Sequence, residues 1–287
     1  MKIIDIISSE KPSLSFEVFP PKTSDTFDSV KKATEDIAKL NPSFMSVTYG
    51  ASGGTSEFTV SVAQNIKNMG VTPIAHLTCV NSTKDDIQHR LKALKDVGIE
   101  NILALRGDIT EENKDKIQFD YKHANELVYD IKAFGDFCIG GACYPEGHPE
   151  SVSQADDIKN LKLKVDAGCS FLTTQMFFDN NILYNYMYKI REAGITVPIV
   201  AGIMPVTNAK QIKRICALSG TYLPQRFKAI VDRYASTPDA MCQAGIAYAT
   251  DQIIDLFANG INAVHVYSMN KEFVARRIQE NISEIIK

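Results

Sequence analysis

The feature that most constrains the fold is a regular alternation of eight short apolar runs with longer amphipathic segments along a chain of 287 residues. In the intervening segments, stripes such as Ile158, Leu161 and Val165 follow the spacing of an α-helix. Short strands separated by helices favour parallel pairing through right-handed crossovers. The eight predicted strands are Leu14–Phe19, Phe44–Thr48, Thr72–Leu77, Asn101–Leu105, Phe137–Ala142, Phe171–Thr174, Pro198–Ala201 and Ala263–Tyr267.

Eight is the number of strands that closes a (β/α)8 barrel, and the length suits one such domain. We therefore predict an α/β fold, a single TIM barrel domain over residues 1–287, with a doubly wound open sheet as the alternative. The seventh and eighth strands are unusually far apart. Extra helices are expected within Asn208–Asn259, with Pro224 and Pro238 as helix starts.

Glycines precede several of the predicted strands, where each would end a helix in the left-handed conformation that glycine adopts without steric cost. These glycines are Gly70, Gly98, Gly135, Gly168, Gly194 and Gly260. They support a repeated βα unit.

Composition excludes several classes of function. The net charge is −3, so no basic excess is available for nucleic acid. No apolar run approaches the length of a membrane span, and Met1–Lys11 lacks the pattern of a secretory signal. The six cysteines form no CxxC pair, and the histidines are too scattered for a metal site. We expect reduced thiols, a cytoplasmic location and no metal.

Polar side chains gather where the predicted strands end, which is where a barrel of this type carries its chemistry. Each has an ordinary structural interpretation: Glu17 as a rim carboxylate, His76 as a core histidine, and Arg106 with Asp108 as an ion pair. Their joint occurrence at successive strand ends predicts a binding cavity. The glycine-rich segment 50–54 lacks the Lys-Ser/Thr ending of a P-loop and is interpreted as a loop over the barrel mouth.

The same strand ends carry nine motifs that resemble the methylenetetrahydrofolate reductases, in order and over nearly the whole chain. The motifs are Ser15–Pro21, Val47–Ala51, His76–Cys79, Ala104–Asp108, Tyr144–Glu150, Leu161–Gly168, Thr174–Asp179, Gly202–Val206 and His265–Asn270. The resemblance implies a barrel that holds FAD and uses NADH or NADPH as the electron donor.

Residues that match the family's sites follow from the resemblance. The implied flavin contacts are Thr48, His76, Arg106, Gly107, Asp108, Ala124, Tyr144, His148, Asp157, Asn160, Lys164 and Tyr267. The implied folate contacts are Glu17, Asp108, Gln175, Gln211 and Lys271. Asn160 and Lys164 lie four positions apart, a spacing that lets both reach one diphosphate from the same helix face.

Three positions depart from the family's usual residues. His123 stands where tyrosine is common, Leu163 where some members have arginine, and Lys271 where an arginine that contacts substrate is common. Lysine lacks the planar fork of arginine, so its grip on a carboxylate is less directional. The alignment also leaves Asp156 as an alternative to Asp157.

The reaction implied by the resemblance is a ping-pong reduction of methylenetetrahydrofolate. The folate ring must open to an iminium cation before it accepts hydride, and opening requires a proton on the departing nitrogen. Glu17 is the predicted acid, because burial between apolar neighbours raises a carboxyl pKa. Asp108 is the predicted anion that stabilises the cation, and Gln175 is expected to orient the pterin or the nicotinamide.

Three other functions stay open at this stage. One is a different flavin barrel, such as a proline-dehydrogenase-like enzyme. Another is a flavin-bearing reductase subunit that receives electrons from a partner protein. The third is a folate-binding scaffold without catalysis. The chain is also expected to form a homo-oligomer.

Overall fold

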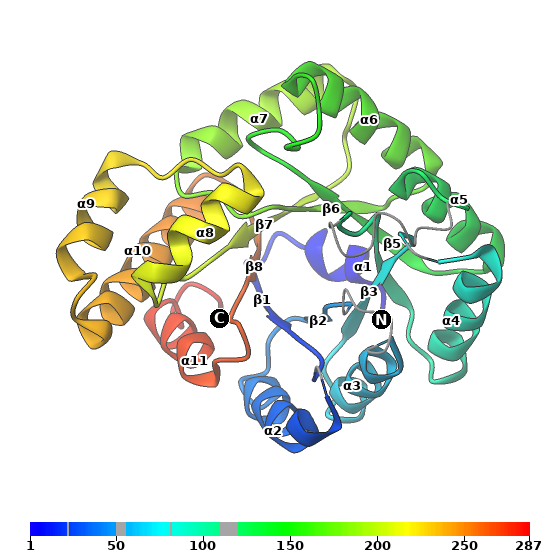
Figure 1. The fold of residues 1–287 in the computed structure, drawn as a ribbon, viewed down its shortest axis with the longest axis horizontal. Coiled ribbons are helices and arrows are strands. Elements are labelled where there is room, and N and C mark those ends of the chain that lie inside the picture. Colours follow the sequence, from blue (N-terminus) through cyan, green and yellow to red (C-terminus); the bar gives the residue numbers. More distant parts are fainter. Residues whose placement is uncertain (22, 50–55, 81, 110–119) are drawn as a thin grey trace.

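Eight parallel strands close into a barrel, each pairing with the next in chain order and the last pairing with the first (Figure 1). The structure is a computed structural model and describes residues 1–21, 23–49, 56–80, 82–109 and 120–287. The strands are β1 (Ser13–Val18), β2 (Met45–Val47), β3 (Pro73–Thr78), β4 (Asn101–Leu105), β5 (Cys138–Cys143), β6 (Phe171–Thr174), β7 (Ile199–Ile203) and β8 (Ala263–Val266). The predicted closed barrel is confirmed, and the glycine-rich segment 50–54 lies outside the described residues.

All the helices of the described residues except α1 lie around the outer side of the barrel (Figure 1). They are α1 (Ile3–Ile7), α2 (Phe27–Ala38), α3 (Ser56–Asn68), α4 (Lys84–Asp96), α5 (Ala124–Phe134), α6 (Gln154–Ala167), α7 (Asn180–Glu192), α8 (Ala209–Ser219), α9 (Gln225–Tyr234), α10 (Pro238–Ala258) and α11 (Glu272–Asn281), with a 3-10 turn at Ser24–Thr26. The predicted stripe of α6 faces inward, since Ile158 and Leu161 are buried and Val165 packs against the core.

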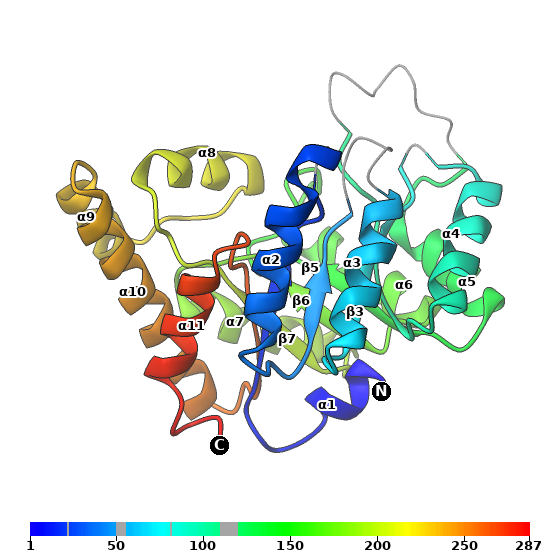
Figure 2. The same cartoon turned by 90° about the horizontal axis from the view of Figure 1, so that it is seen from below.

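The extra helices between the last two strands are confirmed as α8, α9 and α10. Pro238 is the first residue of α10, as predicted, whereas Pro224 is the N-cap that precedes α9. These helices share a separate apolar cluster with the loops after β6 and β7, which includes Met176, Phe178 and Phe227. In Figure 2, α8 lies at the end of the barrel towards which the strands run.

The opposite end of the barrel is closed by the short helix α1, which the sequence analysis did not predict (Figure 2). Ile3 and Ile7 pack there against Phe171, Leu103 and other inward-facing strand residues. The lower half of the barrel is therefore filled with apolar side chains, which leaves only the strand C-termini for a site.

The predicted glycine caps are confirmed at five of six positions, where φ is positive. Gly135 is the exception, because its φ of 171° is extended backbone that any residue can adopt. α5 ends there without a left-handed residue. The Gly135 N–H still closes the last turn of the helix by donating to the Ile131 carbonyl at 3.3 Å.

Candidate active site

Glu17 lies near the C-terminal end of β1 and is only 7% exposed. Its strand register pairs it with Ser46 of β2, whose hydroxyl is hydrogen-bonded to the carboxyl group. Burial raises the pKa of Glu17 to about 8, and the bond to Ser46 offsets only part of this shift. The side chain is therefore a protonated carboxylic acid at neutral pH.

A chain of buried hydrogen bonds continues from Ser46 to His265 of β8 and then to Ser15. Ser15 Oγ donates its single proton to the Val264 carbonyl at 2.9 Å, so it accepts from His265 Nδ1 at 2.8 Å. His265 Nε2 then accepts from Ser46 Oγ at 2.8 Å, because burial lowers the pKa of His265 to about 3 and keeps the ring neutral. With its proton donated to His265, Ser46 can accept from Glu17 while the acid is protonated, whereas donation to the ionised carboxylate, which lowers the pKa of Glu17, would cost the bond to His265.

His76 of β3 lies beside Glu17, with Nε2 of the ring 3.7 Å from Oε2 of the carboxyl group. Burial lowers the pKa of His76 to about 3 and raises that of Glu17, so both groups are neutral and form no ion pair. Within the described ranges, His76 Nε2 is buried without a hydrogen-bond partner. Such a nitrogen is costly to leave unsatisfied, which favours a polar ligand at this point.

Tyr267, just after β8, crosses to β6 and donates from its hydroxyl to the Thr174 carbonyl at 2.6 Å. Gly202 of β7 makes this crossing possible, because a Cβ at that position would lie 2.4 Å from the Tyr267 oxygen and 2.3 Å from the Thr174 oxygen. The Tyr267 ring also meets His265 edge-on at 5.6 Å. These contacts join β6 and β8 across Gly202 at the C-terminal ends of the strands.

Arg106 follows β4 and binds Glu150 through two parallel hydrogen bonds of 2.6 Å each. This bidentate pair holds the guanidinium plane in one orientation and raises the pKa of Arg106. Gly107 adopts φ +90°, and a Cβ there would lie 2.5 Å from Val80 Cγ1. The turn at Gly107 leads to Asp108, whose side chain is exposed at the mouth.

Tyr144, His148 and Asp157 lie together beyond β5 and in the first turns of α6. The Tyr144 and His148 rings meet edge-on at 4.6 Å, and the His148 backbone N–H donates to Asp157. Burial raises the pKa of Asp157 and lowers that of His148. Asp156 supplies its backbone N–H to the Ser153 hydroxyl at the N-cap. The structure thus brings Asp157 next to His148, and which of the two aspartates contacts FAD stays a prediction.

Lys164 of α6 reaches inward over Gly141 and donates from Nζ to the Ala142 carbonyl at 2.6 Å. Burial lowers the pKa of this ammonium group. Asn160, one turn earlier, is exposed, and so is Leu163 at 56%. The structure thus engages Lys164 with β5 and does not bring it to Asn160, so their shared contact with a diphosphate stays a prediction.

The predicted folate residues other than Glu17 lie around the rim. Gln175 Oε1 accepts from the Met176 backbone N–H at 2.9 Å, and Lys271 Nζ donates to Thr207 Oγ1 at 2.7 Å. Gln211 is exposed in the first turn of α8.

The predicted flavin residues Thr48 and Ala124 lie just after β2 and at the start of α5. Thr48 follows β2, where its N–H donates to the Val18 carbonyl at 3.0 Å. Ala124 is the buried first residue of α5, and His123 is the exposed N-cap of that helix.

Three groups that shape the site had no predicted role: Ser15, Ser46 and Glu150. The alternation of β1 places Ser15 and Glu17 on the same face, which is the one available sequence signal. Ser46 becomes relevant only through the register between β1 and β2. Glu150 lies inside a motif of the resemblance, but its pairing with Arg106 joins two separate loops.

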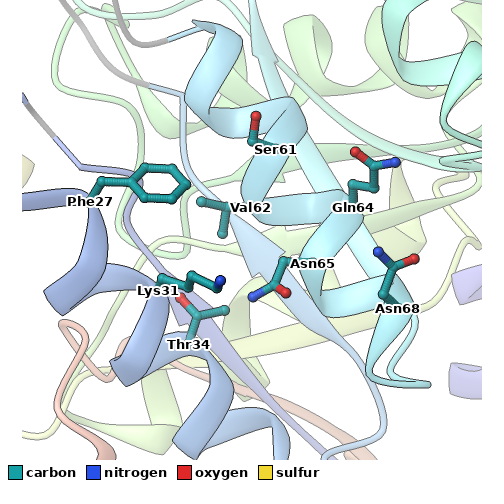
Figure 3. Close-up of a pocket in the computed structure, with 8 residues that line it drawn as sticks. All are labelled: Phe27, Lys31, Thr34, Ser61, Val62, Gln64, Asn65 and Asn68. Atoms are coloured by element: carbon teal, nitrogen blue, oxygen red, sulfur yellow. The ribbon is translucent and has the colours of Figure 1, made fainter. Parts of the chain in front are cut away.

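A separate cavity of about 190 Å³ lies outside the barrel, between α2 and α3 (Figure 3). Its lining combines Phe27 and Val62 with Lys31 and polar side chains of α3. None of the predicted site residues lines it, so it is distinct from the candidate active site.

No helix among the described residues is long and apolar enough to cross a membrane. No group of three or more acidic, histidine or cysteine side chains among them could hold a metal ion. All six cysteines are free thiols.

The fold and its polar mouth define an α/β-barrel protein with a buried acid at the C-terminal ends of the strands. A family model described as methylenetetrahydrofolate reductase matches residues 2–283. The chain belongs to this family. It is 34% identical to "5,10-methylenetetrahydrofolate reductase" of Escherichia coli (strain K12) over 260 residues, which cover 90% of the chain and 86% of that protein.

The plant relatives are longer. "Methylenetetrahydrofolate reductase (NADH) 1" of Zea mays is 35% identical over 298 residues, which cover 99% of this chain and 50% of that protein. The chain thus spans about half the length of such relatives. A solved structure, described as an uncharacterized protein from Clostridium thermocellum that binds two copies of 5-methyl-5,6,7,8-tetrahydrofolic acid, superposes with a TM-score of 0.67 at 15% identity. The superposition covers 96% of this chain and 97% of the chain in that structure, and it shows that the two share a fold.

Proposed function

We propose that this chain reduces 5,10-methylenetetrahydrofolate to 5-methyltetrahydrofolate, with NADH or NADPH as donor and FAD as cofactor. The observation that carries the proposal is Glu17, a buried carboxylic acid that is protonated at neutral pH in a chain of this family. Ring opening of a methylene-bridged folate needs a positioned general acid, and a buried protonated carboxyl group can supply it.

Glu17 supplies the proton that the departing nitrogen of the folate ring requires. As that carbon–nitrogen bond breaks, the proton passes from the carboxyl group to the nitrogen and the remaining carbon becomes an iminium cation. With a pKa of about 8, the carboxyl group is protonated and neutral at neutral pH, yet it is acidic enough to donate its proton.

Ser46 and His265 prepare Glu17 for this step. Before transfer, the Ser46 hydroxyl accepts from the carboxyl group and donates to neutral His265. After transfer, the same hydroxyl can rotate and donate to the new carboxylate, because a hydroxyl carries one donor and two acceptor sites. The single Ser46 proton therefore serves His265 before the transfer and the Glu17 carboxylate after it.

We assign to Asp108 the stabilisation of the cation that this step creates. Its carboxylate stands at the mouth, after the turn at Gly107, and, after burial, it is the next cause that raises the pKa of the nearby Tyr144 hydroxyl. A fixed negative charge stabilises a positive charge that develops during the reaction. Gln175 and Gln211, as amide side chains at the rim, supply donors and acceptors for the pterin.

The residues present fit a flavin dinucleotide. His76 Nε2 is a buried polar atom that lacks a partner within the described residues. The guanidinium group of Arg106 provides a positive charge at the rim. Thr48, His76, Gly107, Tyr144, His148, Asp157 and Lys164 would hold the cofactor, with Ala124, Asn160 and Tyr267 beside them. Bound FAD would carry hydride from the nicotinamide to the folate.

An anaerobic titration tests the proposal. The purified protein should show a flavin spectrum that NADH or NADPH bleaches, and 5,10-methylenetetrahydrofolate should then restore the colour with formation of 5-methyltetrahydrofolate. Acid precipitation should release the flavin as FAD, because no cysteine or histidine stands in a known attachment context. A flavin that is bleached but never reoxidised by the folate would contradict the proposed reaction.

A further inference from the structure

Glu146 joins two loops that carry different parts of the proposed site. It lies between β5 and α6, and its Oε2 accepts from the Tyr222 backbone N–H at 2.8 Å. Tyr222 follows α8, so this bond spans 76 positions of the sequence. The other oxygen, Oε1, is buried and has no hydrogen-bond partner in the part of the chain that the structure describes.

Gly220 and Thr221 lie at the same junction. Gly220 ends α8 in the left-handed conformation, with φ +68°, and a Cβ at this position would lie 3.6 Å from Pro149 Cγ. Thr221 is buried, and its hydroxyl is within 3.4 Å of the Met176 carbonyl. The C-terminal end of α8 is therefore attached to the loops that follow β5 and β6.

These loops and this helix carry the residues assigned to cofactor and folate. The loop after β5 holds Tyr144 and His148, and Gln175 precedes Met176 in the loop after β6. α8 holds Gln211 in its first turn, at the strand-end side of the barrel (Figure 2). A fixed end of α8 therefore fixes where Gln211 stands relative to the other two loops.

We propose that Glu146 is a positioning residue, which holds α8 against the loop after β5 and thereby places Gln211 for the folate. The inference rests on the proposed function. A backbone N–H without its acceptor loses the free energy of that hydrogen bond, and a misplacement of about 1 Å is enough to weaken substrate contacts. Burial also raises the pKa of Glu146.

Four variants separate this role from a general effect on folding. Glu146→Ala removes the acceptor, and Tyr222→Pro removes the N–H donor while leaving Glu146 in place. Glu146→Gln keeps an oxygen acceptor of the same length. Tyr222→Ala is the matched control, because its N–H stays and the lost side chain is 55% exposed.

The measurements are the KM for 5,10-methylenetetrahydrofolate, flavin content, and the rate at which NADH reduces the flavin. We expect Glu146→Ala and Tyr222→Pro to raise the folate KM about tenfold, the effect of one such hydrogen bond, with flavin content and flavin reduction within about twofold of wild type. Glu146→Gln and Tyr222→Ala should keep the wild-type KM. If Glu146→Ala does not fold, Glu146→Asp gives the same test, because its side chain is one methylene too short.

Two results would overturn the inference: an unchanged folate KM in Glu146→Ala and Tyr222→Pro, or an equal loss of flavin reduction and folate turnover. Both presume a wild-type protein that turns over the folate. A wild type that reduces its flavin but leaves 5,10-methylenetetrahydrofolate unchanged would instead contradict the proposed function itself.

Discussion

Glu17 on β1 and His76 on β3 bring Oε2 and Nε2 to 3.7 Å in a buried site, and both side chains are neutral. An exposed pair at this distance would form an ion pair at mildly acidic pH. Here burial disfavours both charged forms, so the carboxyl group keeps its proton and the ring nitrogen stays available to a ligand. A proton donor and a hydrogen-bonding nitrogen thus stand side by side at the barrel mouth.

The pH dependence of folate reduction should follow the pKa of Glu17. As pH rises through about 8, the acid loses its proton, so the rate at which the folate reoxidises the flavin should fall. Rapid mixing of reduced enzyme with 5,10-methylenetetrahydrofolate between pH 6 and 10 measures this. The descending limb should be absent in Glu17→Gln, and its persistence in that variant would assign the ionisation to another group.

Stability should depend on pH through the same carboxyl group. Its native pKa of about 8 exceeds the ordinary value of 4.5, so the native chain binds more protons than the unfolded chain between these values. The stabilisation is complete below pH 4.5 and is lost as pH rises towards 8. In urea denaturation, Glu17→Gln should therefore gain stability relative to wild type as pH rises through this window. A constant difference would show that Glu17 has an ordinary native pKa.

Asp108→Asn should bind flavin normally and slow folate reduction more than NADH oxidation. The lost charge stabilises a cation that forms only in the folate half-reaction. Rapid-mixing measurements of each half-reaction decide the point. Equal slowing of both would mean that Asp108 acts on the flavin and not on the folate.

Gly202→Ala should destabilise the protein by about 3 kcal/mol, because its Cβ would meet the Thr174 carbonyl at 2.3 Å. The rigid backbone there cannot move aside without displacing Tyr267. Gly70→Ala is the matched control: it also loses a glycine, but no atom lies within 4 Å of the new Cβ. Its left-handed φ of +85° should cost only about 1 kcal/mol. Equal losses of unfolding free energy in the two variants, measured by urea denaturation, would contradict the close approach of Gly202 to the Thr174 carbonyl.

The strand order, and the meeting of strand-end side chains at one end of the barrel, could be predicted from the sequence because the βα repeat leaves few topologies. β4 and β6 occur at the predicted residues, and His76 and Glu17 emerge together at one end as parallel strands require. Other features depend on contacts between distant segments. Lys164 bonds to Ala142 because Gly141 leaves room for its side chain, a relation that helix periodicity does not contain.

The ends of elements were harder to predict than their existence. β7 continues to Ile203 because it pairs with β8, whose Val266 lies opposite that residue. The short helix α1 has too little sequence for a periodic signal, and it is stable only because Ile3 and Ile7 close the barrel. Neither effect is local in sequence.

The most direct test of the central claim is the rate of the folate half-reaction in Glu17→Gln. Glutamine keeps the shape and hydrogen bonding of the side chain but cannot deliver a proton at neutral pH. We expect flavin content and NADH oxidation close to wild type, and reoxidation by 5,10-methylenetetrahydrofolate slower by about 10²–10⁴-fold. Reoxidation of the flavin-replete variant at more than about half the wild-type rate would contradict the assignment of Glu17 as the catalytic acid.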